Sequence, residues 1–204
     1  MKSIDTLVKD IYDLFDPLVE VELDEKEVDT QLDSFTKSLK ETLKTFLNEV
    51  PTDRRNLRLS AIGKPARQLW YGKNSKEKPQ PLEPSTRVKF LYGHMLEDLL
   101  ILFSRLAGHT VTDLQKTVYV NGIKGHQDCV IDDVLVDIKS ASASAFKKFE
   151  ENTIHKDDPF GYIAQISAYA EANNVDEAAF LAIDKSSGKI CLTPIHSLGM
   201  INAK

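Results

Sequence analysis

The sequence predicts an α/β fold in which helices flank a mixed central β-sheet. Three patterns support this. Residues 86–107 carry apolar side chains at helical spacing, residues 109–139 contain successive strand patterns, and residues 160–192 are typical of a helix followed by two strands. The order of helices, strands, helix and strands is typical of an α/β domain. At 204 residues, we expect one compact unit with N-terminal helices attached.

Two helices are predicted in the acidic N-terminal segment, residues 1–50. Apolar residues recur at helical spacing in residues 3–18 and 32–49, and the acidic stretch 20–30 between them predicts a connector. Further on, Ser60 is a typical N-cap residue and predicts a short helix just after it.

The strongest helical pattern follows a predicted linker. Residues 73–85 contain three prolines, which indicate a linker or mobile loop. Residues 86–107 then form a helix that ends at Gly108, with one face marked by Val88, Leu91, Met95, Leu99 and Phe103.

The strands are predicted from turn residues between apolar runs. Asn121-Gly122 is a tight-turn pair after one or two strands, and residues 126–132 and 134–139 predict a hairpin around Asp132-Asp133. Helices are expected at about 143–152 and 160–173, and two final strands joined at Ser187-Gly188.

Composition indicates a globular chain without a membrane span. Hydrophobic residues make up 42% and charged residues 28%, and no run approaches the ~18 apolar residues of a spanning helix. The N-terminus lacks the apolar core of a secretory signal. Cys129 and Cys191 lie far apart, which suits a reduced, cytoplasmic protein and excludes an iron–sulfur cluster held by four cysteines.

Charge is distributed unevenly along the chain. The net charge is −7 in residues 1–50, +7 in residues 51–90 and −5 in residues 91–204. This asymmetry favours a local surface for a polyanion on an acidic body, although a solvated basic loop has the same composition.

Two aspartates and a lysine in the hairpin form the main candidate site. Asp137 and Lys139 lie two apart on a strand and therefore share a face, and Asp128 on the preceding strand can approach Asp137. Two converging carboxylates suit a hard divalent cation such as Mg²⁺ or Mn²⁺, and the lysine can hold or deprotonate a water or stabilise a phosphate. The alternative is a surface hairpin with solvated charges.

Four ordered motifs resemble the PD-(D/E)xK nuclease superfamily, in its RecB-like and lambda-exonuclease-like branch. They are Gly93-x-x-x-Glu97 on a helix, Gly125-x-x-Asp128 and Asp137-x-Lys139 on strands, and Gln165-x-x-x-Tyr169 on the following helix. The resemblance covers residues 86–170, and residues 57–72 also resemble an upstream block of phage and bacterial relatives. It implies a restriction-endonuclease-like core, with the nuclease domain in residues 51–204.

The resemblance also implies roles for these residues. Asp128 and Asp137 would bind Mg²⁺ or Mn²⁺, as one or two ions, and Lys139 would be the catalytic lysine. Glu97 would be the acid on the helix. Gln165 and Tyr169 would orient the substrate backbone and the lysine. The backbone carbonyl of Ile138 completes the expected metal ligands.

Some positions depart from the family pattern. His94 stands three residues before Glu97 rather than four, so it ranks below Glu97 as a metal ligand. Gln127 precedes Asp128 where proline is common in this branch. The four cysteines of the iron–sulfur relatives are missing, so no cluster is expected.

Further residues are predicted to contact DNA. Lys64 and Arg67 follow Ser60 in the short helix, Arg58 precedes it, and Trp70 and Tyr71 either stack on bases or pack in the core. We expect Lys73, Lys76 and Lys78 to form an electrostatic fringe. Other candidates near the motifs are His126, Ser140, Ser142 and Tyr162, whereas Asp132 and Asp133 are assigned to the turn.

The sequence therefore predicts a metal-dependent deoxyribonuclease, with an exonuclease on DNA ends or single strands favoured. Its setting, by resemblance, is phage-type recombination or DNA degradation. The alternatives are a structure-selective endonuclease, a non-catalytic DNA-binding protein with the same fold, and a regulatory protein whose acidic N-terminal helices bind a partner or cover the basic surface.

Overall fold

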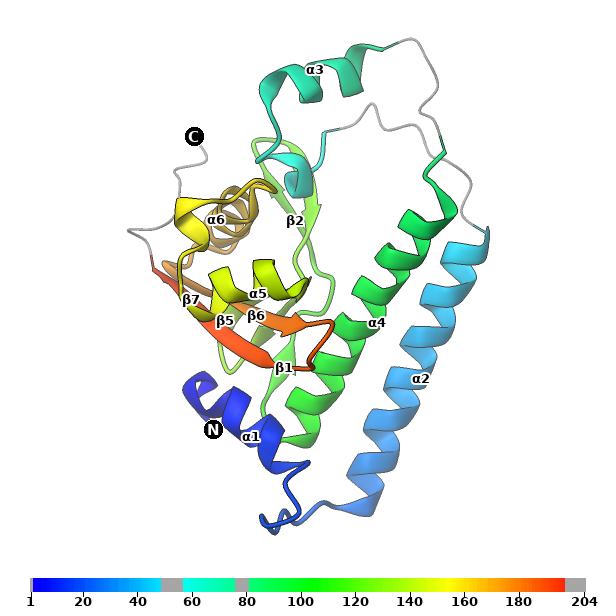
Figure 1. Cartoon of the computed structure of the whole chain (residues 1–204), viewed down its shortest axis with the longest axis vertical. Helices are drawn as coiled ribbons and strands as arrows, with labels where there is room; N and C mark the ends of the chain where they lie inside the picture. Colours follow the sequence, from blue (N-terminus) through cyan, green and yellow to red (C-terminus); the bar gives the residue numbers. More distant parts are fainter. Residues whose placement is uncertain (1, 49–56, 76–80, 197–204) are drawn as a thin grey trace.

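A five-stranded mixed sheet organises the chain, as the computed structural model in Figure 1 shows. The structure describes residues 2–48, 57–75 and 81–196. The strand order is β1-β4-β5-β6-β7, and β5 and β6 are parallel while their other neighbours are antiparallel. The bounds of these strands are Val111–Thr112, Cys129–Ile131, Val134–Ala141, Glu177–Asp184 and Ile190–His196.

Helices cover both faces of this sheet, which confirms the predicted fold class. On one face lie α5 (Ala143–Glu150) and α6 (Tyr162–Asn173), and on the other lie α1 (Leu7–Asp13) and α4 (Pro84–Leu106). Because side chains alternate along a strand, each central strand contributes to two separate apolar clusters. In β5, Leu135 and Ala141 join the α6 side, and Val136 and Ile138 join the α4 side.

A two-stranded ribbon, β2 (Thr117–Val120) and β3 (Ile123–His126), lies beside α6. The predicted tight turn joins its strands: Asn121 and Gly122 have φ angles of 48° and 77°. The other predicted turn is also present, with Asp132 and Asp133 at φ 46° and 67°. However, residues 126–132 do not form one strand. Gln127 and Asp128 lie outside any strand, between the end of β3 at His126 and the start of β4 at Cys129.

The N-terminal helices differ from their predicted bounds. The first is only α1, residues 7–13, preceded by a 3-10 turn at Ile4–Thr6. The second, α2, runs over Glu25–Asn48 and so includes part of the acidic stretch predicted as a connector. The apolar spacing alone did not predict this first part of α2. Glu25 and Glu27 favour a helix N-terminus there, because a negative charge interacts favourably with the helix dipole.

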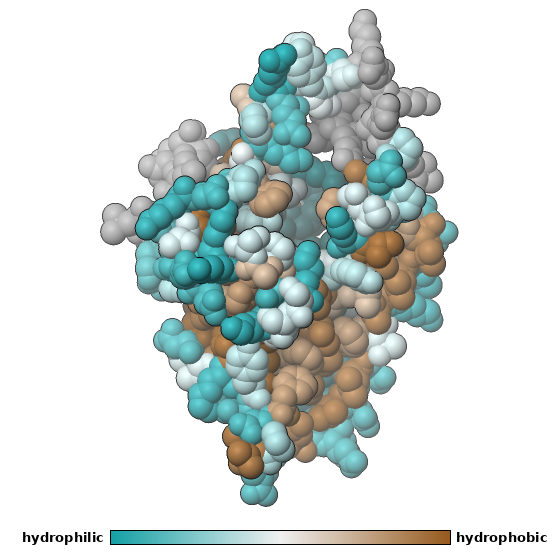
Figure 2. Space-filling view, in the orientation of Figure 1, coloured by the Kyte–Doolittle hydropathy of each residue, from teal (hydrophilic) through white to brown (hydrophobic). Residues whose placement is uncertain are grey.

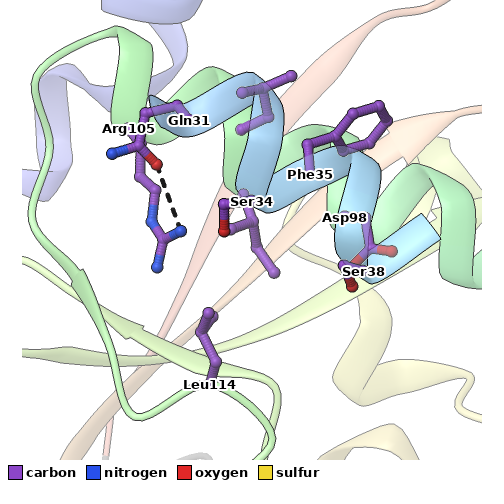
Figure 3. Close-up of a pocket in the computed structure, with 9 residues that line it drawn as sticks. Gln31, Ser34, Phe35, Ser38, Asp98, Arg105 and Leu114 are labelled. Atoms are coloured by element: carbon purple, nitrogen blue, oxygen red, sulfur yellow. Dashed lines mark hydrogen bonds between the residues drawn. The ribbon is translucent and has the colours of Figure 1, made fainter. Parts of the chain in front are cut away.

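Helix α2 lies alongside α4 over a partly polar seam (Figure 3). The Ser38 hydroxyl donates to Asp98 Oδ1 at 2.9 Å, and Arg105 donates to Gln31 Oε1 at 3.4 Å. No residue of α2 is fully buried. Burial raises the pKa of Asp98, and the Ser38 hydrogen bond partly opposes this.

Two predictions about helix termini have different outcomes. Helix α4 ends as predicted, with Gly108 at φ 81° just after its C-cap. Ser60, in contrast, lies inside a 3-10 turn (η2, Leu59–Ala61) and caps no helix. The next helix, α3 (Ala66–Asn74), begins after Pro65, whose fixed φ suits that position. Of the predicted linker, residues 76–80 lie outside the described residues.

Candidate active site

Asp128 and Asp137 come together where β4 and β5 pair. Cys129 pairs with Val136 in this antiparallel ladder, so the register extended by one residue places Asp128 beside Asp137. The backbone N–H of Ile138 donates to Asp128 Oδ2 at 2.8 Å, which holds this side chain next to β5 although Asp128 lies just outside a strand. The pairing predicted from the sequence is therefore present, through a backbone contact.

Lys139 forms an ion pair with Asp137. Both side chains project from the face of β5 that also carries Leu135 and faces α6. Asp137 is only 1% exposed, and its two carboxylate oxygens accept no hydrogen bond apart from this ion pair. The ammonium of Lys139 also lies 4.9 Å from the centroid of the Tyr162 ring.

The electrostatics of this group reflect one cation among several buried acids. Burial raises the pKa of Asp128 well above its usual range, and the charges of Asp137 and Glu97 raise it further. Burial also raises the pKa of Asp137, although Lys139 opposes the rise. Burial lowers the pKa of Lys139, but Asp137 and Asp128 raise it more strongly, so the net shift is upward. The lysine therefore keeps its proton at neutral pH in this arrangement.

Glu97 extends from α4 towards the same group. Its charge raises the pKa values of both aspartates. Gln115 donates to Glu97 Oε1 at 2.5 Å and orients the carboxylate. His94 lies on the outer side, with Nδ1 3.7 Å from Glu97 Oε2 and its side chain 54% exposed. This arrangement is consistent with ranking Glu97 above His94.

The motif residues of α6 line the other side of Lys139. Gln165 Nε2 donates to the Tyr169 hydroxyl at 3.2 Å. Burial raises the pKa of Tyr169 to about 12, with a further contribution from the charge of Asp137. Tyr162 stacks on Phe160, which steadies the ring near Lys139. Tyr162, Gln165 and Tyr169 therefore share the helical face predicted from their spacing.

Packing explains the glycine of the G-x-x-D motif. A Cβ atom on Gly125 would lie 2.8 Å from Leu59 Cβ and 2.8 Å from Tyr169 Cε1. Only a glycine allows β3 to approach both residues this closely. At Gly93, a Cβ would meet Ser140 Oγ at an ordinary 3.5 Å, which shows that α4 passes next to β5 just beyond Lys139.

Two supporting residues were not predicted from the sequence as site residues. Gln127 is fully buried, and its Oε1 accepts a hydrogen bond from Asn173 Nδ2 at 2.6 Å. This bond ties the residue before Asp128 to the end of α6. Gln115 is the second. Its contact with Glu97 joins residues 18 positions apart through tertiary structure, so no local pattern could indicate it.

Other candidates near the motifs lie at the edge of the group. His126 is exposed, and its Nδ1 lies 3.3 Å from the Thr117 hydroxyl. Ser140 is half-buried beside α4, and Ser142 is the N-cap residue of α5. Asp132 has a structural role in addition to the turn, because it accepts the Thr110 N–H and pairs with buried His109.

The predicted DNA-contacting segment lies on the surface. Lys64, Arg67 and Lys73 are exposed, as are Arg58 and Ser60. Trp70 is 60% exposed and Tyr71 52%, so the alternative that these rings pack in the core is wrong. The whole of α3 lies on the surface, since none of its residues is buried. Lys76 and Lys78 lie outside the described residues.

The residues present suit a hard divalent cation by their chemistry. Buried Asp137, half-buried Asp128 and a nearby glutamate offer oxygen ligands of the kind that Mg²⁺ and Mn²⁺ prefer. Among the residues that the structure describes, however, no three His, Cys, Asp or Glu side chains converge on one point as they stand. Lys139 supplies the positive charge next to Asp137 instead.

Comparison with solved structures shows which known fold the chain shares. The alkaline exonuclease of Laribacter hongkongensis superposes with a TM-score of 0.50 and 17% identity, over 71% of this chain and 78% of its own. The chain therefore shares the fold of this alkaline exonuclease. The same enzyme in complex with dAMP gives a TM-score of 0.47 at 17% identity, over 71% of this chain and 78% of its own. A phage-related exonuclease from Haemophilus somnus gives 0.48 at 14% identity, covering 69% and 84%.

Sequence comparison adds no relative to these structural matches. No protein-family model matches the chain, and no curated protein matches its sequence. Within the described ranges, no helix is both long and apolar enough to cross a bilayer. Cys129 and Cys191 are both free thiols.

Proposed function

We propose that the chain is a Mg²⁺- or Mn²⁺-dependent DNA exonuclease that acts on DNA ends or single strands, in phage-type recombination or DNA degradation. The observation that carries this proposal is the group formed by buried Asp137 and half-buried Asp128 and Lys139, at the central strand of a sheet shared with an alkaline exonuclease. Burying two carboxylates is costly, and a structural role alone would be met better by neutral side chains. Perturbed acids next to a cation are typical of a functional site.

The residues of the chain divide the work in this proposal. Asp128, Asp137, Glu97 and the Ile138 carbonyl would hold the metal ion, which when bound supplies Lewis acidity and a more acidic water. Lys139 keeps its proton in the arrangement described, so it suits stabilisation of charge on the phosphate rather than proton abstraction. Tyr162 and the Gln165–Tyr169 pair restrict the orientation of Lys139 from the α6 side.

A cleavage assay tests the proposal. The substrates are end-labelled linear single-stranded DNA, linear duplex and closed circular duplex, each with Mg²⁺, Mn²⁺ or EDTA. We expect metal-dependent loss of linear DNA only. Lys139→Ala and Asp137→Asn should lower the rate by at least about 100-fold, as expected when a group that stabilises the transition state is removed. Lys147→Ala, which removes an exposed lysine on α5, is the matched control.

The outcomes separate this proposal from its alternatives. Cutting of the circle at a comparable rate would identify an endonuclease. Binding of DNA with no cleavage of any substrate would support a non-catalytic protein of the same fold. In the structure α2 lies against α4. A rate unchanged when Glu25, Glu27, Asp29 and Asp33 on the exposed surface of α2 are replaced by their amides would exclude a covering role for that helix.

A further inference from the structure

Helix α3 exposes two large aromatic side chains side by side. Trp70 and Tyr71 are 60% and 52% exposed, and their rings meet edge to face with centroids 5.2 Å apart. Trp70 is the only tryptophan in the chain. Aromatic rings normally contribute most when they are buried, and here none of the nine residues of α3 is buried. Packing within this chain therefore does not account for the pair.

The surroundings of this pair are basic. The guanidinium of Arg67 lies 5.7 Å from the centroid of the Tyr71 ring, and Lys64 and Lys73 flank it. The helix contains no acidic residue. Among described residues, none of these three cations forms an ion pair with a described acid. Hydrophilic side chains cover this end of the molecule, while apolar side chains gather beside α4 (Figure 2).

A tight backbone contact connects the base of α3 to the candidate active site. A Cβ on Gly63 would lie 2.2 Å from the Cα of Gly161, so the two backbones touch. Gly161 is the N-cap of α6, and the next residue is Tyr162, whose ring faces Lys139. On the other side of the same turn, buried Leu59 packs against Gly125. The turn at the base of α3 therefore lies against the start of α6, one residue before Tyr162.

We propose that α3 is a stacking platform for unpaired bases beside the cleavage site, with Trp70 and Tyr71 as the stacking rings and Lys64, Arg67 and Lys73 as phosphate contacts. This inference rests on the proposed nuclease function and names its substrate as single-stranded DNA. Rings exposed next to cations suit unpaired bases, because every base has a stacking face and a phosphate at a regular distance from it. Bases within a duplex are stacked on each other and do not offer that face.

The single tryptophan makes the test direct, because emission excited at wavelengths that tyrosine does not absorb reports on Trp70 alone. The protein is titrated in EDTA with a 15-nucleotide oligo-dT, with an abasic strand of equal length, and with blunt duplex. We expect oligo-dT to quench Trp70 emission and the abasic strand to bind through its phosphates without quenching. Equal quenching by the abasic strand would overturn the stacking role.

Binding of labelled oligo-dT by anisotropy tests the residue. Trp70→Leu should weaken binding about ten-fold, Trp70→Phe should retain most of it, and Tyr119→Leu, on the exposed side of β2, should not change it. The melting temperature should stay the same, because Trp70 is exposed. Unchanged binding by Trp70→Leu would overturn the proposal, as would Trp70 emission that follows protein concentration rather than DNA, which would indicate a second copy on α3.

The platform and the nuclease can fail separately. Base-dependent quenching with no metal-dependent cleavage would leave the platform and remove the nuclease function. Metal-dependent cleavage of single strands, with binding of oligo-dT unchanged in Trp70→Leu, would leave the nuclease and remove the platform.

Discussion

Replacing Lys139 by methionine keeps the length of the side chain and removes its charge from beside buried Asp137 and half-buried Asp128. The Asp137 side chain is 2% exposed and the Lys139 side chain 15% exposed, so solvent screens their ion pair weakly. Removing one member of such a buried pair costs about 3–5 kcal/mol. Adding Asp137→Asn to Lys139→Met leaves neutral side chains of similar shape, and we expect the double variant to recover at least ~2 kcal/mol relative to additivity.

The loss of stability in Lys139→Met should depend on pH. Burial already raises the pKa values of Asp137 and Asp128, and Lys139 opposes the rise in both, so its removal raises them further. A carboxyl group whose pKa is raised on folding contributes its full stability below the unfolded value of about 3.8. That stability is lost as the pH rises through the folded pKa. The deficit should therefore be larger at pH 8 than at pH 5.

Urea denaturation in EDTA at pH 5 and pH 8 measures both effects. The set comprises the wild type, the two single variants, the double variant and the exposed-lysine control Lys147→Met. The control should stay within about 0.5 kcal/mol of the wild type, as is usual for surface substitutions. An equal deficit of Lys139→Met at both pH values, or strict additivity in the double variant, would show that the ion pair does not stabilise this group.

Three further predictions concern metal, packing and DNA. Saturating Mn²⁺, at about 100 times its dissociation constant, should stabilise the wild type by about 2.7 kcal/mol and raise its melting temperature by roughly 5–10 °C, whereas Asp137→Asn should not respond. Gly125→Ala should lower the free energy of unfolding by about 1–3 kcal/mol, because its Cβ would clash with Leu59 and Tyr169. Gly72→Ala should not lower it, because the space around its Cβ position is open, and thermal denaturation of both variants measures the difference. Arg67→Ala should reduce the slope of log affinity against log salt by about one for a DNA oligonucleotide, and an unchanged slope would remove Arg67 from the phosphate contacts.

Local chemistry made much of the architecture predictable from the sequence. The turns at Asn121-Gly122 and Asp132-Asp133 need residues that tolerate positive φ angles, and the residue types state this directly. Helix α4 was predicted to within two residues at its start and one at its end, because its apolar spacing is regular and Gly108 ends it. The prediction that Ser60 caps a helix was wrong, because a serine also occurs in other kinds of turn. Here it lies in a 3-10 turn next to buried Leu59.

The pairing of Asp137 with Lys139 also followed from the sequence, because residues two apart on a strand share a face. Only the tertiary structure decided their environment: which carboxylates are desolvated, that Gln115 orients Glu97, and that Gln127 is tied to Asn173. It also decided that Trp70 is outside rather than in the core. Spacing along the chain determines which side chains share a face of one helix or strand. Burial depends on which other elements pack against that face, and those contacts join residues that are distant in sequence.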